Sequence, residues 1–311
     1  MSILITGSTG FVGSNLASYI KKELGHSIVK VTRNQDQIDG EVISYDHLFS
    51  SNVIGFSSYF HLAGKAHDLK NTFDESEYFK VNYELTKRLF DRFLEDKMAQ
   101  RFIFISSVKA VADSVEGDLR EDYSPNPVTA YGRSKLKAEQ YIQDNLPDDR
   151  TVVILRPCMI HGPGNKGNLN LLHSMISKGV PWPLGLYDNT RSFLSIDNLC
   201  YVMKKILDGE IQSGVYNVAD DETLSTMELV SIIAEISNKR PRIWNVPKSL
   251  IRMVAKVGNV LPIPLNEERL DKLTENYLVS NKKIKNELGI NRMPISAKEG
   301  MIKTLKDFES S

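Results

Sequence analysis

Short runs of apolar residues alternate along this chain with longer stretches in which apolar positions recur at helical spacing. The longer stretches predict helices near Ser14 to Leu24, Tyr78 to Lys97 and Tyr131 to Asn145. The short runs predict strands over Ser2 to Thr6, Ile28 to Thr32, Val42 to Tyr45, Tyr59 to Leu62, Phe102 to Ser106, Val152 to Leu155 and Val215 to Val218. Because strands that alternate with helices are typical of a parallel sheet covered on both faces, we expect a doubly wound α/β fold.

The N-terminus combines a strand, a glycine-rich turn and a helix. The strand at Ser2 to Thr6 is followed at once by a turn with the spacing G-x-x-G-x-x-G, and the helical pattern begins at Ser14. Glycines let a backbone turn sharply and approach a pyrophosphate, and a helix N-terminus stabilises the phosphate charge. This context predicts the opening of a dinucleotide-binding fold. The cofactor contacts expected from it come from Gly7, Thr9, Gly10, Phe11, Val12 and Gly13.

The end of the second predicted strand should meet the adenine ribose of such a cofactor. A carboxylate at this place would favour NAD, but the chain has Thr32-Arg33-Asn34. Arg33 could pair with a 2′-phosphate, which favours NADP(H) over NAD(H), although an arginine on a solvated strand end is nearly as good an interpretation. Asp46 could bond the adenine amine or belong to a surface turn.

Tyr131 and Lys135 are the residues with the most specific chemistry. Residues four apart lie on one face of a helix, so the ammonium of Lys135 is expected beside the phenol of Tyr131, where it favours the ionised form. A tyrosine with such a neighbour can act as a general acid or base. Ser107, at the end of an apolar strand, could hold a substrate oxygen where the proton is exchanged. This trio suits hydride chemistry at a C–OH/C=O centre.

Further segments complete a family pattern. They are Thr6 to Gly13, Tyr59-Phe60-His61-Leu62-Ala63-Gly64, Val81-Asn82, Phe104-Ile105-Ser106-Ser107, Tyr131-Gly132-Arg133-Ser134-Lys135, Arg156-Pro157 and Gly162-Pro163-Gly164. With them the chain resembles the extended short-chain dehydrogenase/reductase superfamily, in its NAD(P)-dependent epimerase/dehydratase branch that works on nucleotide sugars. The match is dense in the first half of the chain and sparse in the second.

The resemblance implies roles for several residues around the cofactor. Ala63 and Gly64 would end the fourth strand against it, and Asn82 with the Ser106 region would line its nicotinamide side. Lys135 would also bond the nicotinamide ribose, Tyr131 would be the acid/base, and Ser107 would complete the catalytic group.

The resemblance also implies two parts. Residues 1–157 would form a Rossmann-type dinucleotide-binding domain, rejoined by about residues 190–220, and residues 158–189 and 221–311 a smaller α/β substrate-binding lobe. Backbone donors before the helix near Leu169 could meet a diphosphate, or the segment could be an ordinary loop. The substrate contacts expected are Lys109, Asn165, Lys166, Asn168 and Arg191, of which the arginine matches a family segment that reaches the diphosphate.

The two residues after Ser107 narrow the choice among the reactions of this family. Dehydratases of this family place an Asp-Glu pair there, whereas this chain has Val108 and Lys109, which disfavours 4,6-dehydration. Reduction of a 4-keto UDP-(N-acetyl)hexose in cell-surface polysaccharide synthesis is favoured over UDP-hexose 4-epimerisation, since Arg33 suggests NADPH. A non-catalytic NADP sensor is a distant third, because it predicts loss of Tyr131 or Lys135. The family also makes a homodimer the default expectation.

Composition excludes several other classes. Lys plus Arg and Asp plus Glu both number 39, so there is no global electrostatic case for a nucleic acid or an anionic membrane as partner, and any anion binding must be local. No apolar run is long enough to span a bilayer, and the first strand begins at residue 2, which leaves no room for a signal peptide, so we expect a cytoplasmic protein.

The remaining candidate groups are interpreted as structural. Cys158 and Cys200 lack metal or disulfide spacing and are expected to be buried, inert thiols. The histidines His61, His67, His161 and His173 have no ligand spacing, so no metal is expected. A helical stripe is expected to pack in the core of the smaller lobe rather than to anchor a membrane, because its interleaved basic residues Lys248, Arg252 and Lys256 are few. The stripe is Leu250, Ile251, Met253, Val254 and Val257.

Overall fold

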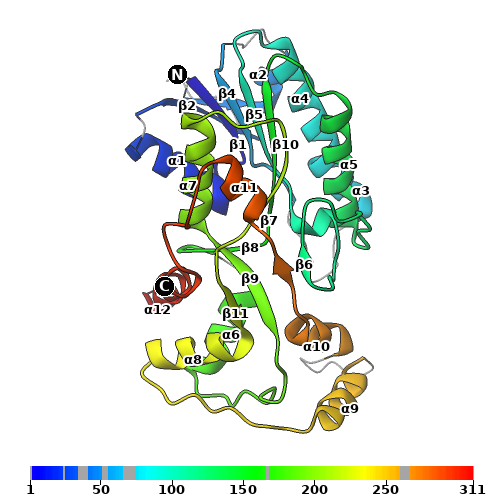
Figure 1. Ribbon diagram of the computed structural model, residues 1–311, viewed down its shortest axis with the longest axis vertical. Coiled ribbons are helices and arrows are strands. Elements are labelled where there is room, and N and C mark those ends of the chain that lie inside the picture. Colours follow the sequence, from blue (N-terminus) through cyan, green and yellow to red (C-terminus); the bar gives the residue numbers. More distant parts are fainter. Residues whose placement is uncertain are drawn as a thin grey trace.

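A seven-stranded parallel sheet forms the larger part of the molecule (Figure 1). The computed structural model describes residues 2–23, 25–33, 41–50, 55–65, 74–165, 168–259 and 266–310. The strands are β1 (Ser2–Thr6), β2 (Ser27–Thr32), β3 (Val42–Ser44), β4 (Ser58–His61), β5 (Arg101–Ile105), β7 (Thr151–Pro157) and β10 (Gly214–Val218). Their order is β10-β7-β5-β4-β1-β2-β3, so the direction of progression reverses between β1 and β4. This confirms the doubly wound fold and marks the switch point where such sheets bind ligands.

Helices cover both faces of this sheet. Figure 1 shows α1 (Phe11–Glu23) and α7 (Ile196–Asp208) on one side, and α4 (Leu85–Glu95) and α5 (Ala130–Asp144) on the other. Alternate strand residues point to opposite faces, as the period of two requires. In β1, for example, Ile3 and Ile5 pack under α1 and α7, whereas Leu4 packs under α4 and α5. Both faces are therefore closed by apolar layers.

The long helix expected from Tyr78 to Lys97 is divided into three pieces. It begins as α3 (Glu75–Phe79), passes through one π-helical turn over Lys80–Glu84, and continues as α4. π-Helical turns occur often at functional sites. Here the turn carries Asn82, whose side chain is completely buried. The apolar period predicted the helix, but it does not distinguish a π turn from an α turn.

The smaller lobe contains a three-stranded sheet and most of the remaining helices. Its strand order is β11 (Thr223–Ser225), β9 (Thr190–Ser195) and β8 (Met159–His161), with β11 antiparallel and β8 parallel to β9. A short parallel pair of β6 (Asp118–Leu119) and β12 (Leu278–Val279) adjoins it. The helices are α6 (Asn168–Ser177), α8 (Thr226–Ile236), α9 (Lys248–Gly258), α10 (Glu267–Thr274) and α12 (Ala297–Ser310), while α2 (Tyr45–Ser50) and α11 (Lys282–Glu287) lie beside the large sheet.

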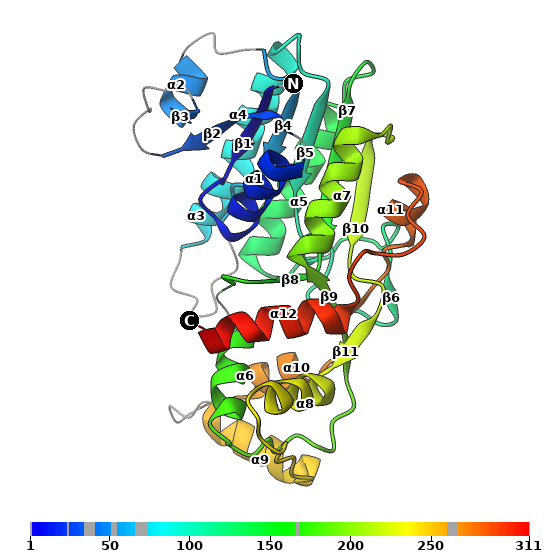
Figure 2. The ribbon, with the colours of Figure 1, turned by 90° about the vertical axis from the view of Figure 1, so that its left-hand side faces the viewer.

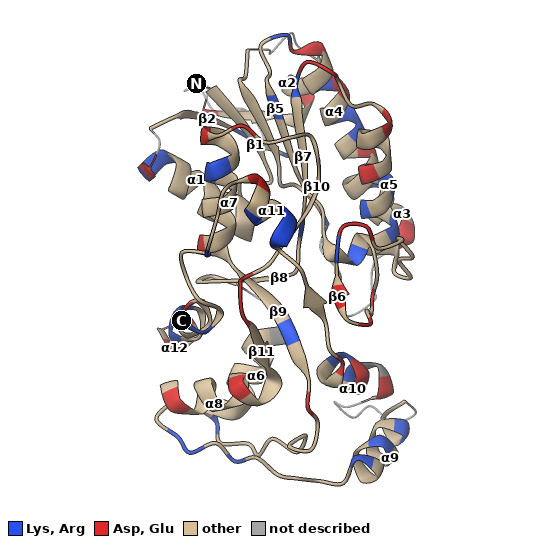
Figure 3. Cartoon of the chain, viewed as in Figure 1, with Lys and Arg blue, Asp and Glu red and all other residues tan. Residues whose placement is uncertain are grey.

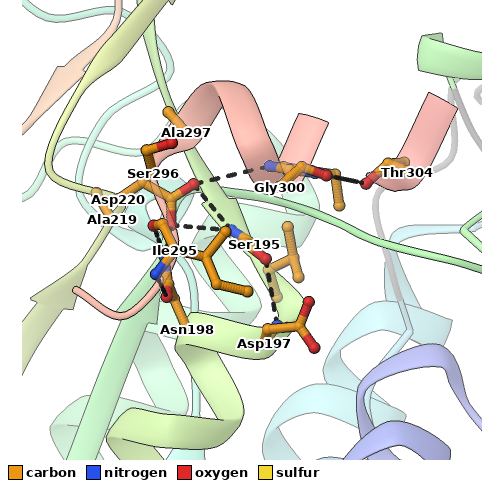
Figure 4. A network of polar contacts seen from close by, with 12 residues as sticks. Ser195, Asp197, Asn198, Ala219, Asp220, Ile295, Ser296, Ala297, Gly300 and Thr304 are labelled. Carbon is orange, nitrogen blue, oxygen red and sulfur yellow. Dashed lines mark hydrogen bonds and ion pairs between the residues drawn. The ribbon is translucent and has the colours of Figure 1, made fainter. Parts of the chain in front are cut away.

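A buried polar network connects the two parts near α12, which crosses between them in Figure 2. The Asp220 carboxylate accepts hydrogen bonds from the Ser195 backbone at 3.0 Å and from the Asn198 amide at 2.7 Å (Figure 4). Asn198 in turn exchanges hydrogen bonds of 2.8 and 3.1 Å with the backbone of Ile295. Because these groups are buried, each must keep its partner, and the end of β9, the start of α7 and the approach to α12 are held together.

The expectation that the α9 stripe is core was wrong for four of its five residues. Ile251 is buried, but the side chains of Leu250, Met253, Val254 and Val257 are 45, 57, 41 and 45 % exposed. The helix contacts α10, and its buried residues are Ile251 and Ala255, which are one turn apart. The stripe is wider than this narrow contact, so most of it faces solvent.

The expectations for thiols and membrane spans can also be compared with the structure. Cys158 and Cys200 are both free and buried, which confirms that interpretation, and burial raises the pKa of both thiols, that of Cys200 to about 12. Across the described ranges, no helix is both long and apolar enough to cross a membrane.

Candidate active site

The glycine turn packs against the end of β4 at the switch point. Gly7 has φ of +69°, and a Cβ atom on it would lie 2.6 Å from the backbone nitrogen of Ala63. A Cβ atom on Gly13 would lie 2.2 Å from the Gly7 carbonyl oxygen. The Ser8 hydroxyl in this turn is buried and has no hydrogen-bond partner within the described part of the chain. A tight turn, an unpaired buried donor and the N-terminus of α1 fit the pyrophosphate of a dinucleotide.

The expected adenosine contacts lie at the neighbouring edge of the sheet. Arg33 follows β2 and Asp46 lies in the first turn of α2, and both side chains are exposed. The sequence analysis did not single out Tyr45. Burial raises the pKa of its phenol to about 12, while a hydrogen bond with Thr6 of β1 and the charge of Arg33 after β2 lower it. Arg33 and Tyr45 therefore lie close together beyond the ends of β1 and β2.

Helix α5 brings the proposed acid/base group to the end of β5. The helix begins after Thr129, whose hydroxyl accepts a hydrogen bond of 3.2 Å from the Gly132 backbone. Tyr131 and Lys135 follow on the face turned to the sheet. Ser107 is the second residue after β5, and its hydroxyl lies against the Tyr131 phenol and favours the ionised form. The structure thus assembles the three residues that the sequence placed together.

The predicted electrostatics of Tyr131 need a correction. The pKa of its phenol is raised above 10, because burial disfavours the phenolate more than the Ser107 hydroxyl stabilises it, and Tyr78 and Glu139 add to the rise. The ammonium of Lys135 points elsewhere and donates a hydrogen bond of 2.8 Å to the Ile105 carbonyl. Helical spacing placed the two residues on one face, but it could not fix which acceptor the ammonium uses.

The pKa of the Lys135 ammonium is also shifted by its surroundings. Its side chain is 4 % exposed, and burial lowers the pKa of its ammonium to about 8, with Glu139 opposing the shift. The nitrogen lies 4.7 Å from the centre of the Phe104 ring. A Cβ atom on Gly64 would lie only 3.0 Å from it, so Gly64 keeps space open beside the ammonium.

The lowered pKa of Lys135 predicts that the stability of the fold depends on pH. Between about pH 8 and pH 10.5, the ordinary value for lysine, the unfolded chain holds a proton on Lys135 that the folded chain has released, so stability rises with pH in this window. Lys135→Met should lose this rise, whereas Lys137→Met, at an exposed position on the same helix, should keep it. Urea unfolding of the three proteins across the window measures the difference, and parallel curves for all three would contradict the assignment.

A buried ion pair beneath the site was missed by the sequence analysis. Glu139 lies one turn beyond Lys135 and is fully buried. Its carboxylate accepts hydrogen bonds from Arg156 at 2.5, 3.0 and 3.1 Å and another from the Ser106 hydroxyl. The pair ties α5 to β7 and β5. The repeat of Tyr131, Lys135 and Glu139 at steps of four was the available signal.

Asn82 fixes the segment that follows β4. Its side-chain oxygen accepts a hydrogen bond of 2.7 Å from the Lys65 backbone, and its amide donates to Lys65 and to Ser134 of α5 at 3.1 and 3.0 Å. A Cβ atom on Gly64 would lie 3.2 Å from that same oxygen. Asn82 therefore positions Gly64 and Lys65 next to Lys135.

Two of the expected substrate residues lie close together between the sheet and the smaller lobe. The Lys109 ammonium donates to the Asp113 carbonyl at 2.7 Å and lies 4.4 Å from the centre of the Tyr277 ring. Arg191 donates to the Glu275 backbone and carboxylate at 3.2 and 3.4 Å. Burial lowers the pKa of both cations, and each lies close enough to Glu275 to be stabilised by it. This pair of cations could face a diphosphate.

The loop after β8 gives less support to the substrate contacts expected in it. The Asn165 amide turns back to the Ile160 carbonyl at 3.4 Å, within its own loop. Asn168 begins α6, and Lys166 lies outside the described residues, as does His67. Over the parts of the chain that are described, no group of three or more His, Cys, Asp or Glu side chains could hold a metal ion.

A doubly wound sheet with a glycine turn at its switch point, followed by a Ser, Tyr and Lys group, defines a Rossmann-fold enzyme that uses a nicotinamide dinucleotide. Comparison with known proteins identifies its class more closely. The model of the NAD dependent epimerase/dehydratase family matches residues 3–219, and the chain belongs to this family.

The relatives include both epimerases and reductases. The chain is 31 % identical over 327 residues to a UDP-glucose 4-epimerase of Vibrio cholerae, covering 99 % of this chain and 95 % of that one. It is 28 % identical over 286 residues to a UDP-2-acetamido-2,6-beta-L-arabino-hexul-4-ose reductase of Pseudomonas aeruginosa, covering 88 and 66 % of the two chains. The UDP-glucuronic acid 4-epimerase of Bacillus cereus with NAD has the same fold, with a TM-score of 0.75 at 20 % identity over 100 % of this chain and 99 % of that one.

Proposed function

We propose that the protein is an NAD(P)-dependent 4-epimerase of a UDP-hexose. The observation that carries the proposal is the full-length likeness to a UDP-glucose 4-epimerase in a chain that also assembles Ser107, Tyr131 and Lys135. The sequence alone favoured reduction, and the relative changes the order of the two reactions. The proposed site lies where the large sheet and its helices meet the smaller lobe. The boundary expected at residue 190 needs a correction, because β9 (Thr190–Ser195) pairs with β8 and β11 in the sheet of the smaller lobe.

In this proposal Tyr131 moves the proton. The nicotinamide, with Lys135 at its ribose, would supply reversible hydride transfer to either face of C4 of the hexose. Tyr131, as phenolate, takes the proton of the C4 hydroxyl and gives it back in the second half, so the protein ends unchanged. The Ser107 hydroxyl donates a hydrogen bond to the same oxygen and favours the phenolate, and Lys135 holds the nicotinamide ribose.

Dehydration fits this site poorly. Removal of water from C5 and C6 needs a carboxylic acid and a base beside the Ser107 position. Val108 is an apolar side chain, 4 % exposed, and the Lys109 ammonium is bound to the Asp113 carbonyl. The reaction that these residues support ends at the exchange of hydride and proton at C4.

Reduction of a 4-keto UDP-sugar is the second candidate. Arg33 favours it, because an exposed arginine beyond β2 can pair with the 2′-phosphate of NADPH, the usual reducing carrier. The Pseudomonas aeruginosa relative is a reductase. The same three catalytic residues serve both reactions, so the difference lies in whether the cofactor stays bound between turnovers.

One experiment separates the two reactions. The purified protein is incubated with UDP-glucose and UDP-N-acetylglucosamine without added cofactor, and products are separated by ion-pair chromatography. An epimerase forms the C4 epimer and carries a bound nicotinamide that denaturation releases. NADPH oxidation only on addition of a 4-keto UDP-sugar, with no C4 epimer formed, would replace epimerisation by reduction.

Arg33→Asp tests the cofactor preference. If Arg33 pairs with the 2′-phosphate, its replacement should raise the KM for NADP(H) by at least about tenfold, the equivalent of one charge-assisted hydrogen bond, and should improve use of NAD(H). Arg292→Asp, which makes the same charge change at a side chain 72 % exposed in the smaller lobe, should leave both KM values unchanged. Equal use of the two cofactors before and after the Arg33 change would show that Arg33 takes no part.

A further inference from the structure

The exposed face of α9 continues into a surface of unusual composition. We define the basic-apolar surface as residues 239–259, which comprise the segment after α8 and all of α9. Its apolar side chains include four exposed residues of α9, and Trp244, which is 57 % exposed. Figures 1 and 2 both place α9 at the end of the smaller lobe farthest from the large sheet. Large apolar side chains gathered at one exposed end point to an interaction surface.

The charge of this surface differs from that of the whole chain. The chain carries 39 basic and 39 acidic residues, whereas residues 239–259 contain no Asp or Glu. The basic side chains of the surface are all exposed, and Figure 3 shows them along α9 and along the segment that leads to it. They are Lys239, Arg240, Arg242, Lys248, Arg252 and Lys256. Overall neutrality therefore hides a local excess of six positive charges.

The segment before α9 is held in place with its tryptophan outward. The Trp182 backbone donates to the Arg242 carbonyl at 2.7 Å, and the Trp244 backbone donates to the Trp182 carbonyl at 2.8 Å. These bonds fix the strand-like stretch against the lobe, and Trp182 itself is buried. The indole of Trp244 thus stays exposed although its backbone is anchored.

Helix α9 separates its side chains into three arcs. With about 100° per residue, the exposed apolar residues Leu250, Met253, Val254 and Val257 occupy an arc of about 100°. Ile251 and Ala255 lie on one flank and face the lobe. Lys248, Arg252 and Lys256 lie on the opposite face, centred about 150° from the middle of the apolar arc. An apolar arc on one face and a row of cations on the opposite face, with a tryptophan close by in the chain, is the pattern of a helix that lies in a membrane interface.

The acidic residues facing α9 reduce its charge without cancelling it. Glu267 and Asp271 of α10 line a hollow together with Arg252, Met253 and Lys256. The Glu267 carboxylate accepts a hydrogen bond of 2.6 Å from Asn259. The other four basic residues of the surface do not line this hollow.

We propose that the basic-apolar surface binds the protein to an anionic lipid bilayer. The apolar arc of α9 and Trp244 enter the boundary between headgroups and acyl chains, and the six cations contact lipid phosphates. A second copy of the chain fits the surface less well, because pairing would bring two sets of six positive charges together. This revises the expectation that the protein has no membrane partner, which rested on the balanced total charge.

Vesicle sedimentation tests the proposal. The full chain is spun with vesicles of equal parts phosphatidylglycerol and phosphatidylcholine, and separately with phosphatidylcholine alone. We expect binding to the anionic vesicles, weaker binding as salt is raised, and little binding to the neutral ones. Met253→Ser/Val257→Ser and Arg252→Glu/Lys256→Glu should each weaken the binding by at least about tenfold, since they remove buried apolar area or reverse attraction.

Matched variants keep the test specific. Met98→Ser removes a methionine that is 65 % exposed at the other end of the molecule, and Lys21→Glu/Lys22→Glu makes the same charge change on α1. Both should bind vesicles like the unchanged protein, and all variants should keep its far-ultraviolet circular dichroism. Absence of binding to anionic vesicles overturns the proposal. Equal weakening of vesicle binding in the control variants also overturns it. A third contrary outcome is a protein that does not bind vesicles but forms a concentration-dependent dimer, which Met253→Ser/Val257→Ser dissociates.

Discussion

Replacing Tyr131 by Phe should lower the turnover number by at least about a hundredfold, the usual contribution of a positioned general acid or base. The change removes one oxygen and keeps the ring, which packs against Tyr78 with ring centres 6.4 Å apart. The hydride can then leave C4 only if the hydroxyl proton finds another acceptor, and Ser107 is too weak a base to supply one. Cofactor affinity should hardly change. Steady-state turnover and fluorescence titration with the nicotinamide dinucleotide measure the two effects.

Tyr141→Phe is the matched control for this variant. Tyr141 lies on the same helix, and its hydroxyl contacts Asp91 and Lys87 of α4 rather than the site. Its removal should leave turnover within about twofold of the unchanged protein, because the hydroxyl touches no reacting atom. A Tyr131→Phe protein that turns over at a near-normal rate would refute the acid/base role.

Glu139→Ala should destabilise the fold strongly. It leaves the Arg156 guanidinium, 5 % exposed, buried without its carboxylate. Breaking a buried ion pair from one side costs about 3–5 kcal/mol of unfolding free energy. The loss should appear as a lower midpoint in urea unfolding followed by circular dichroism.

Two further variants separate the ion pair from other effects of truncation. Glu95→Ala removes a carboxylate that is 65 % exposed and pairs with Arg92 three residues before it, and should cost about 0–1 kcal/mol. Glu139→Leu/Arg156→Met removes both charges and should recover part of the stability, since no buried charge is then unpaired. If Glu139→Ala and Glu95→Ala had equal costs, the buried pair would contribute nothing particular.

The large sheet and its order of elements could be predicted from the sequence, because strand-length apolar runs and helical periods are local signals. The close packing of the glycine turn could also be predicted, because a Cβ atom at Gly7 or Gly13 would prevent the backbone contacts that the structure shows. The division of the helix around Asn82 was not predictable in this way. A π turn leaves the apolar spacing nearly unchanged.

For the site, the sequence predicted which residues meet but not how they affect one another. Tyr131 and Lys135 share a helix face, as four-residue spacing requires. The direction of the pKa shift of Tyr131 depends on burial and on which acceptor the Lys135 ammonium binds, and both are properties of the assembled fold. The same limit applies to α9, where periodicity revealed an apolar stripe but not which part of it has a neighbour.

Strand β10 has a consequence for synthesis of the protein on the ribosome. It forms one edge of the large sheet beside β7, yet the chain makes β8 and β9 of the smaller lobe before it reaches Gly214. While the nascent chain is shorter than this, the unpaired edge of β7 can recruit other strands, which is a common origin of aggregation. Slow translation between residues 158 and 213 would therefore lengthen the time for which the edge of β7 is exposed.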